Sequence, residues 1–162
     1  MNVQEKYWKL MVQMKAWIFY LDIYSEESYK WDRRINVFTA LVSSASIASW
    51  AIWTKYSFLW GLAIAISQVI NAIKPILPFS RRIDVIGKMY PRIVDLYNEI
   101  DRKWFNVSDG SLTAVEINDL IYNYKVIYTN IENECIKNPI LVKNKKIHAK
   151  ADKQVEEYFT NY

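Results

Sequence analysis

Between positions 35 and 73 the chain is almost entirely apolar, and Lys55 carries the only charge in this stretch. Residues 35–54 form an uncharged run of 20 residues, and residues 56–73 form a second run of 18. At 1.5 Å per residue the first run makes a helix of about 30 Å, the thickness of a bilayer's hydrocarbon core. The segment between the runs is long enough only for a turn. The pattern predicts a hairpin of two membrane-spanning helices.

A hairpin buried in a soluble core would have a similar apolar pattern. A chain of 162 residues is too small, however, to surround two adjacent apolar helices of bilayer length. Aromatic side chains also gather around the turn, and amphipathic rings prefer the membrane interface. These aromatic residues are Trp50, Trp53, Tyr56, Phe58 and Trp60. The sequence therefore favours the membrane hairpin.

Basic residues mark one side of the hairpin. They are Arg33 and Arg34 before it, and Lys74, Arg81 and Arg82 after it. Because positive charge is retained on the cytoplasmic side, both termini are expected in the cytoplasm. The first thirty residues carry charges throughout, so no cleavable signal peptide is expected. The expected location is a bacterial inner membrane, crossed twice.

The rest of the chain shows helical periodicity, which makes the predicted fold all-α. Residues 2–31 form an amphipathic pattern that suits packing on a cytoplasmic bundle or burial among lipid headgroups. We expect three regions: an N-terminal amphipathic cytoplasmic helix over 1–33, the transmembrane hairpin over 34–79, and a C-terminal cytoplasmic helical bundle over 80–162.

Local signals place the boundaries of the C-terminal helices. Pro75 and Pro78 are expected to kink or end the second apolar helix, and Pro91 to kink or restart the third. A loop is expected over 106–111. The capping box from Thr113 to Glu116 opens a fourth helix, which Asn138-Pro139 ends. A last helix is expected over about 140–159.

The sequence gives little support for catalysis. His148 is the one histidine and Cys135 the one cysteine, so the chain cannot assemble a metal site of His and Cys ligands. The motifs of serine hydrolases, P-loop proteins and dinucleotide-binding folds do not occur in it. His148 is most simply a surface residue of a basic helix. We expect no enzyme activity and no cofactor.

Polar side chains form a stripe on each apolar run, within an arc of about 60–80° at 100° per residue. Lipid cannot satisfy polar groups, so each stripe is expected to face protein or water. Tight helix packing explains the Ser and Thr positions as well as a pore does. Asn71 and Lys74 favour a pore mouth shared by at least about four copies. The candidate pore-lining residues are Asn36, Thr39, Ser43, Ser46, Ser67, Asn71 and Lys74.

The spans contain no acidic residue, and arginines lie close to their ends, so a pore of this composition is expected to prefer anions. Snorkelling of Lys74 to lipid phosphates is the competing explanation of that residue.

A second candidate site lies on the last helix, where Lys143, Lys146, Lys150 and Lys153 share an arc of about 80°. Residues 143–153 hold five lysines and one acid, a net charge of +4. Such a strip suits the phosphates of a nucleotide or short nucleic acid, with Tyr158 or Tyr162 available for stacking. A solvated helix face and attraction to anionic lipid headgroups explain the strip equally.

The order of parts over nearly the whole chain resembles the SLATT superfamily of two-transmembrane effectors in bacterial nucleotide-signalling defence. The resemblance rests on an aromatic-rich cytoplasmic helix, the sequence Trp31-Asp32-Arg33-Arg34, and a first span rich in small residues at 40–51. The aromatic residues of that helix are Trp17, Tyr20, Tyr24 and Tyr29. The chain is also similar to the channel effectors of Hailong defence systems.

The resemblance implies a homo-oligomeric pore that the product of a partner nucleotidyltransferase opens or holds closed. Opening would depolarise the membrane and stop phage replication. The alternative function is a two-pass membrane anchor or scaffold that recruits a cytoplasmic partner. A holin-like toxin or a small transporter subunit is a third class, although a holin needs no set of cytoplasmic helices.

Overall fold

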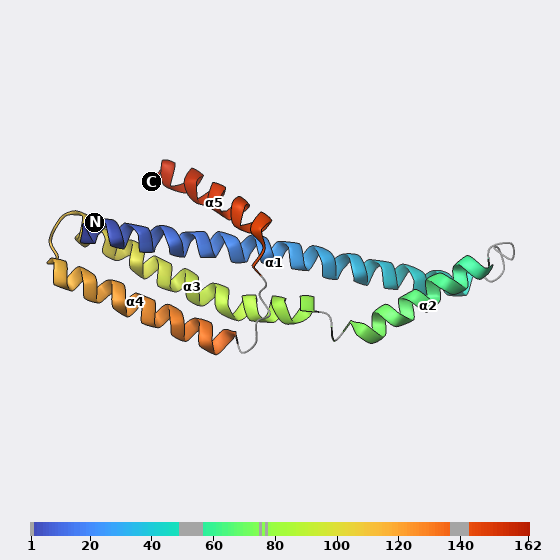
Figure 1. Ribbon diagram of the computed structural model, residues 1–162. Helices are drawn as coiled ribbons and strands as arrows, with labels where there is room; N and C mark the ends of the chain where they lie inside the picture. The colour runs from blue at the N-terminus through green and yellow to red at the C-terminus, as the bar shows by residue number, and fades with distance from the viewer. Residues whose placement is uncertain (1, 49–56, 75, 77, 137–142) are drawn as a thin grey trace. The chain divides into compact units, whose positions relative to one another are not determined.

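The computed structural model describes residues 2–48, 57–74, 76, 78–136 and 143–162. This part of the chain is helical and contains no strand, which confirms the all-α prediction (Figure 1). Its helices are α1 (Val3–Ala48), α2 (Ser57–Ile73), α3 (Pro78–Ser108), α4 (Ala114–Cys135) and α5 (Lys145–Thr160).

These helices form two compact units. Unit 1 comprises Met1–Ser25 and Asp84–Tyr162, and unit 2 comprises Glu26–Ile83. Unit 1 therefore joins the first part of α1 to most of α3 and to α4 and α5. Unit 2 contains the rest of α1, α2 and the start of α3. The N-terminal helix, expected to be a region of its own, thus shares a unit with the C-terminal helices.

Helix α1 is continuous over 46 residues, from the amphipathic segment into the first apolar run. No proline or glycine occurs before Gly61, so nothing in the sequence breaks the helix there. Its apolar positions in unit 1 recur every three or four residues and are buried. They are Tyr7, Met11, Met14, Ile18 and Leu21. This face packs in one cluster with residues of α3, α4 and α5, as the bundle alternative predicted.

Side-chain hydrogen bonds tie α1 to α3 inside unit 1. The hydroxyl of Tyr7, which is fully buried, donates to the carbonyl oxygen of Ile100 at 2.9 Å. The Gln4 amide donates to the carbonyl oxygen of Val107 at 2.8 Å. Both carbonyls already belong to α3, so these bonds fix the register of one helix against the other.

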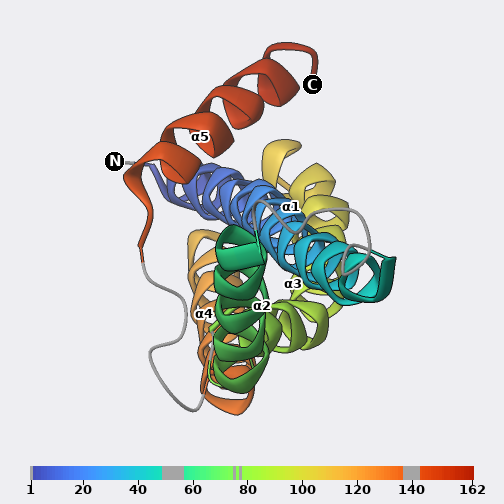
Figure 2. The ribbon, with the colours of Figure 1, turned by 90° about the vertical axis from the view of Figure 1, so that its right-hand side faces the viewer.

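Helix α5 lies on the side of α1 away from α4 in both views of unit 1 (Figures 1 and 2). Its residues Ile147, Ala151 and Val155 are buried. The backbone amide of Asn144 donates to the Tyr20 hydroxyl at 3.2 Å. The Lys15 ammonium lies 3.9 Å from the centroid of the Tyr158 ring, a cation–π contact. These contacts hold α5 on α1.

The capping box at the start of α4 is confirmed. The Thr113 amide donates to the Glu116 carboxylate at 2.7 Å, and the Glu116 amide donates to the Thr113 hydroxyl at 3.3 Å. Hydrogen bonds from Thr113 lower the pKa of Glu116. Two backbone donors at the helix start are thereby satisfied.

Of the kink or restart predicted at Pro91, the restart is wrong, because α3 runs through this residue. A proline ring crowds the carbonyl four residues earlier and leaves it without its helical donor. That position is Gly87, which has no Cβ, and both residues are exposed. Water can therefore reach the Gly87 carbonyl.

The other boundaries differ by a few residues from those expected. Helix α3 ends at Ser108, and the turn that follows includes Gly110 at a φ of 78°. Helix α5 begins at Lys145, where Asn144 caps it, rather than near 140. Helix α2 ends at Ile73, before Pro75, as predicted. Asn138 and Pro139 lie outside the described residues.

The two apolar runs of the predicted hairpin correspond to the later part of α1 and to α2. The turn expected between them, including Trp50, Trp53, Lys55 and Tyr56, lies outside the described residues. Among the residues that the structure describes, no helix combines the length and the apolar character needed to cross a membrane.

Replacing Thr113 by alanine should lower the free energy of unfolding by about 0.5–2 kcal/mol, because the start of α4 loses its cap. Thr129→Ala is the matched control in the same helix, since Thr129 is exposed and alanine is the better helix former. Denaturant unfolding of the full chain, followed by circular dichroism, measures both. Equal losses in the two variants would contradict the capping role.

Unit 1 should also lose stability in alkali. Burial raises the pKa of Tyr128 to about 12, with help from the Glu132 carboxylate. Unfolded tyrosines ionise near 10, so the folded state holds more protons between about pH 10 and 12. The free energy of unfolding should therefore fall as the pH rises through this window.

Tyr128→Phe should make that fall shallower in pH-dependent denaturant unfolding. Tyr122→Phe on the same helix is the control, because the Tyr122 side chain is 66% exposed and meets water in both states. A fall that is unchanged in Tyr128→Phe, or reduced equally by the control, would show that burial of Tyr128 is not its cause.

Candidate functional site

The candidate pore-lining residues all belong to unit 2. Asn36, Thr39, Ser43 and Ser46 lie on α1, Ser67 and Asn71 lie on α2, and Lys74 directly follows α2. The side chains of Ser43 and Ser46 are outside the described part of the structure. Of the remaining five, Lys74 and Asn36 belong to a series of hydrogen-bonded side chains, here called the polar chain. Thr39 and Ser67 are buried, and Asn71 is exposed.

The polar chain links α2 to α1. The Lys74 ammonium donates to the side-chain oxygen of Asn36, and the Asn36 amide donates to the Asp32 carboxylate at 2.8 Å. Lys74 and Asn36 are both half-buried. The amide of Asn36 thus connects a cation to an anion, which offsets part of the cost of burying the Lys74 charge.

Thr39 and Ser67 form the buried pair, exposed by 8% and 1% respectively. The Thr39 hydroxyl donates to the carbonyl oxygens of Ile35 and Asn36 in its own helix, each at 3.0 Å. The Ser67 hydroxyl has no hydrogen-bond partner among the described residues. Small polar side chains buried in this way are typical of close helix packing.

Asn71 is exposed, and so is Gln68 one turn earlier. At 100° per residue Gln68 lies on the side of α2 that also carries Gly61, Ala65 and Ala72, and Asn71 lies at the edge of that side, next to Ser67. A separate face of α2 exposes Leu62, Ile66, Val69 and Ile73. Helix α2 therefore presents three faces: one buried in unit 2, one exposed and apolar, and one exposed with small and polar residues.

Unit 2 also exposes apolar side chains on α1 and at the start of α2. Val37 is 50% exposed and Leu41 63%, while Phe58 reaches 81%. Single exposed apolar side chains are normal on protein surfaces, but such a number in one small unit is typical of an interaction site.

The lysines expected to bind a ligand lie at the surface of unit 1. Lys146, Lys150 and Lys153 lie on α5, and Lys143 precedes it; all four are exposed. At 100° per residue Lys146, Lys150 and Lys153 lie on the side of α5 next to its buried face. The Lys153 ammonium also pairs with the Glu157 carboxylate at 3.7 Å.

The aromatic residues expected to stack on a bound base already have partners. The Tyr158 ring covers the Lys15 ammonium, and the Tyr162 hydroxyl donates to the Asp101 carboxylate at 2.7 Å. His148 is half-buried rather than at the surface, and its ring centroid lies 4.4 Å from that of Tyr20. Stacking on a ligand would require these side chains to leave their places.

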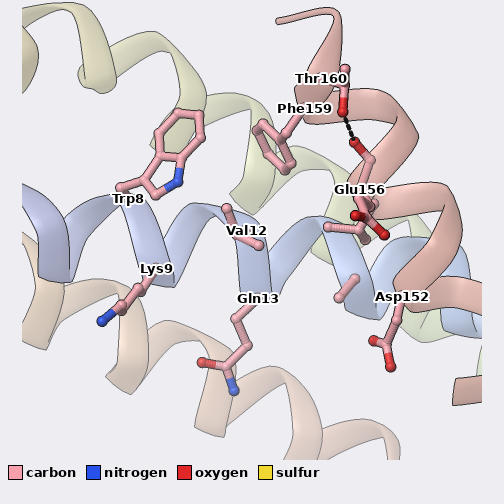
Figure 3. A pocket seen from close by; sticks show the side chains of 10 residues that line it. Trp8, Lys9, Val12, Gln13, Asp152, Glu156, Phe159 and Thr160 are labelled. Carbon is pink, nitrogen blue, oxygen red and sulfur yellow. Dashed lines mark hydrogen bonds between the residues drawn. The ribbon is translucent and has the colours of Figure 1, made fainter. Parts of the chain in front are cut away.

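A groove of about 630 Å³ runs between α1 and α5 in unit 1 (Figure 3). Trp8 and Phe159 face each other in it, with ring centroids 5.0 Å apart. Asp152 and Glu156 of α5 also line it, whereas the four candidate lysines do not. Carboxylates do not suit a phosphate ligand. No sequence pattern predicted this groove, because the residues of its two walls are more than a hundred positions apart.

In the part of the chain that the structure describes, no three His, Cys, Asp or Glu side chains lie close enough together to hold a metal ion. Comparison of the chain with protein-family models, with curated proteins and with solved structures found no match. Functional inference therefore depends on the geometry of the two units and on the sequence.

The contact between Lys74 and Asn36 can be tested by crosslinking. In a Cys135→Ser background, which removes the native thiol, Asn36→Cys with Lys74→Cys should be joined within one chain by a short bis-thiol reagent. Asn36→Cys with Val69→Cys is the control, because Val69 is 60% exposed on another face of α2. Electrophoretic mobility and mass spectrometry report the product. Equal crosslinking of the two pairs would contradict the packing of unit 2.

Proposed function

We propose that this chain is an oligomeric membrane pore, whose copies conduct ions across a bacterial inner membrane as an effector of antiphage defence. Unit 2 inserts as the hairpin, and unit 1 lies in the cytoplasm. The observation that carries the proposal is the exposed apolar surface of unit 2.

Unit 1 and unit 2 differ in the exposed fraction of their large apolar side chains. Unit 1 buries most of its large apolar side chains, Met11 and Ile93 to 0% exposure, although Phe105 is 71% exposed. Most of those described in unit 2 are exposed, Leu59 by 60% and Ile76 by 76%. Leaving apolar area in water costs about 25 cal/mol for each Å². A bilayer removes that cost over two runs of sequence that lack charge. This contrast supports membrane insertion of unit 2 rather than of the whole chain.

The exposed amides of α2 support assembly of several copies. Gln68 and Asn71 lie beside an apolar surface, and lipid offers them no hydrogen-bond partners. A second copy or a water-filled path would satisfy both amides. Two helices cannot enclose such a path, so a pore requires at least about four copies.

Gating is proposed through unit 1. By its resemblance to SLATT effectors, the chain would respond to a nucleotide or short nucleic acid made by a partner nucleotidyltransferase. The exposed lysines at 143, 146, 150 and 153 are the surface whose charge suits phosphates. Anion preference remains part of the proposal, although Lys74 is already joined to Asp32 through Asn36.

A two-pass anchor that recruits a cytoplasmic partner is the second candidate. The burial of Thr39 and Ser67 favours it, because these residues then pack the hairpin instead of lining a channel. An anchor would insert as readily as a pore but would conduct no ions.

Ion flux separates the two functions. The purified chain in liposomes should release trapped chloride, monitored with an anion-sensitive dye, and added nucleotide or short DNA should change the rate. Asn71→Leu should lower the flux several-fold, because an exposed amide at the edge of the small-residue face becomes apolar. Val69→Leu on the apolar face is the matched control and should conduct as the wild type does.

Insertion without flux, with or without nucleotide and short DNA, would favour the anchor. Flux that Asn71→Leu and Val69→Leu reduce equally would remove Asn71 from the pore. Expression in cells gives an independent comparison, since an open channel arrests growth and an anchor does not.

A further inference from the structure

A patch on α1 in unit 2 joins three basic residues to three apolar ones. Lys30, Arg33 and Arg34 are followed by Val37, Phe38 and Leu41, at spacings of three and four residues that keep them on one side of the helix. Together they line a shallow hollow of about 410 Å³. The patch was not among the candidate sites that the sequence suggested.

The basic half of this patch carries a net positive charge. The Lys30 ammonium pairs with the Glu26 carboxylate at 2.7 Å. Glu27 and Asp32 are the other acids near these basic residues in the sequence, and the Asp32 carboxylate accepts a hydrogen bond from Asn36 at 2.8 Å. The hollow itself is lined by Lys30, Arg33 and Arg34 and by no acidic side chain, so an anion in it would meet positive charge.

The apolar half is open to its surroundings. Val37 is 50% exposed, Phe38 39% and Leu41 63%. Beside the arginines, Trp31 is 52% exposed, and the Arg34 guanidinium lies 5.4 Å from the centroid of its ring. An amphipathic ring next to basic side chains is typical of the level of lipid headgroups.

The chemistry of the two halves identifies the occupant. Guanidinium groups bind phosphate oxygens in pairs, whereas the aliphatic side chains of Val37 and Leu41 offer nothing to a free phosphate or a nucleic acid. A molecule that carries a phosphate at one end and a hydrocarbon chain at the other fits both halves. From Arg33 to Leu41 the helix rises about 12 Å, long enough for a headgroup and the upper part of an acyl chain.

We infer that this patch binds an anionic phospholipid, with its phosphate at Arg33 and Arg34 and its acyl chain along Val37, Phe38 and Leu41. The inference rests on the proposed membrane insertion of unit 2 and adds a lipid specificity to it. Bound lipid would fix the depth of α1 in the cytoplasmic leaflet, where anionic headgroups attract nearby cations.

Binding to vesicles tests the inference. The full-length chain should partition at least about tenfold more strongly into vesicles containing phosphatidylglycerol than into vesicles of phosphatidylcholine alone. Arg33→Gln with Arg34→Gln should abolish most of that preference. Arg102→Gln with Lys125→Gln removes the same charge from exposed positions of unit 1 and should retain it. Circular dichroism of each variant shows whether it folds.

The outcomes separate the inference from the proposed function. Equal binding to both vesicles would overturn the lipid site and leave membrane insertion standing, whereas no binding to either would overturn both. If both double variants lost the preference for phosphatidylglycerol equally, the preference would depend on the net charge of the protein and not on Arg33 and Arg34. Loss in Lys146→Gln with Lys150→Gln instead would move the lipid site to α5.

Native mass spectrometry in detergent supplies a second readout. Phosphatidylglycerol should remain bound to the wild type and not to Arg33→Gln with Arg34→Gln. Inorganic phosphate should not displace it, because phosphate lacks the acyl chain that Val37, Phe38 and Leu41 contact. Displacement by phosphate would show an anion site without lipid specificity.

Discussion

The continuous backbone of α1 is the constraint on which both units depend. One helix of 46 residues supplies a buried face to unit 1 and, further along, an exposed apolar surface to unit 2. Because each helical residue is hydrogen-bonded to the next turn, the helix passes from its buried apolar face in unit 1 to its exposed apolar surface in unit 2 without a break. The division between the units falls between Ser25 and Glu26, where a polar stretch that extends to Arg34 interrupts the apolar pattern.

Polar contacts in the two units serve different purposes. In unit 1, Tyr7 and Gln4 bond to backbone carbonyls of α3 and set helix register. In unit 2, the contact from Lys74 through Asn36 to Asp32 joins charges that would otherwise be costly to bury. Such a contact fixes where α2 lies along α1. While this contact remains, α2 cannot slide along α1.

Local chemistry was predictable from the sequence, and long-range contacts were not. The Thr113 cap depends on residues three positions apart, and its pattern is specific. The continuity of α3 at Pro91 depends on Gly87 and on exposure of that turn, which a proline rule alone does not include. Thr39 and Ser67 show a similar limit of sequence-based prediction. A helical wheel places each on a polar stripe, but it does not show whether that stripe packs against another helix or lines a pore. The groove beside Trp8 and Phe159 requires α5 to fold back onto α1.

The composition of unit 1 has a consequence for the order of events during synthesis. Its core joins the first 25 residues to residues 84–162, so the apolar face of α1 leaves the ribosome long before its partners in α3, α4 and α5 exist. The uncharged runs over 35–73 emerge in the interval. Early domains usually fold as they are made. Here the core of unit 1 can form only after residues 35–73 have been synthesised, so the two apolar runs emerge before unit 1 is complete.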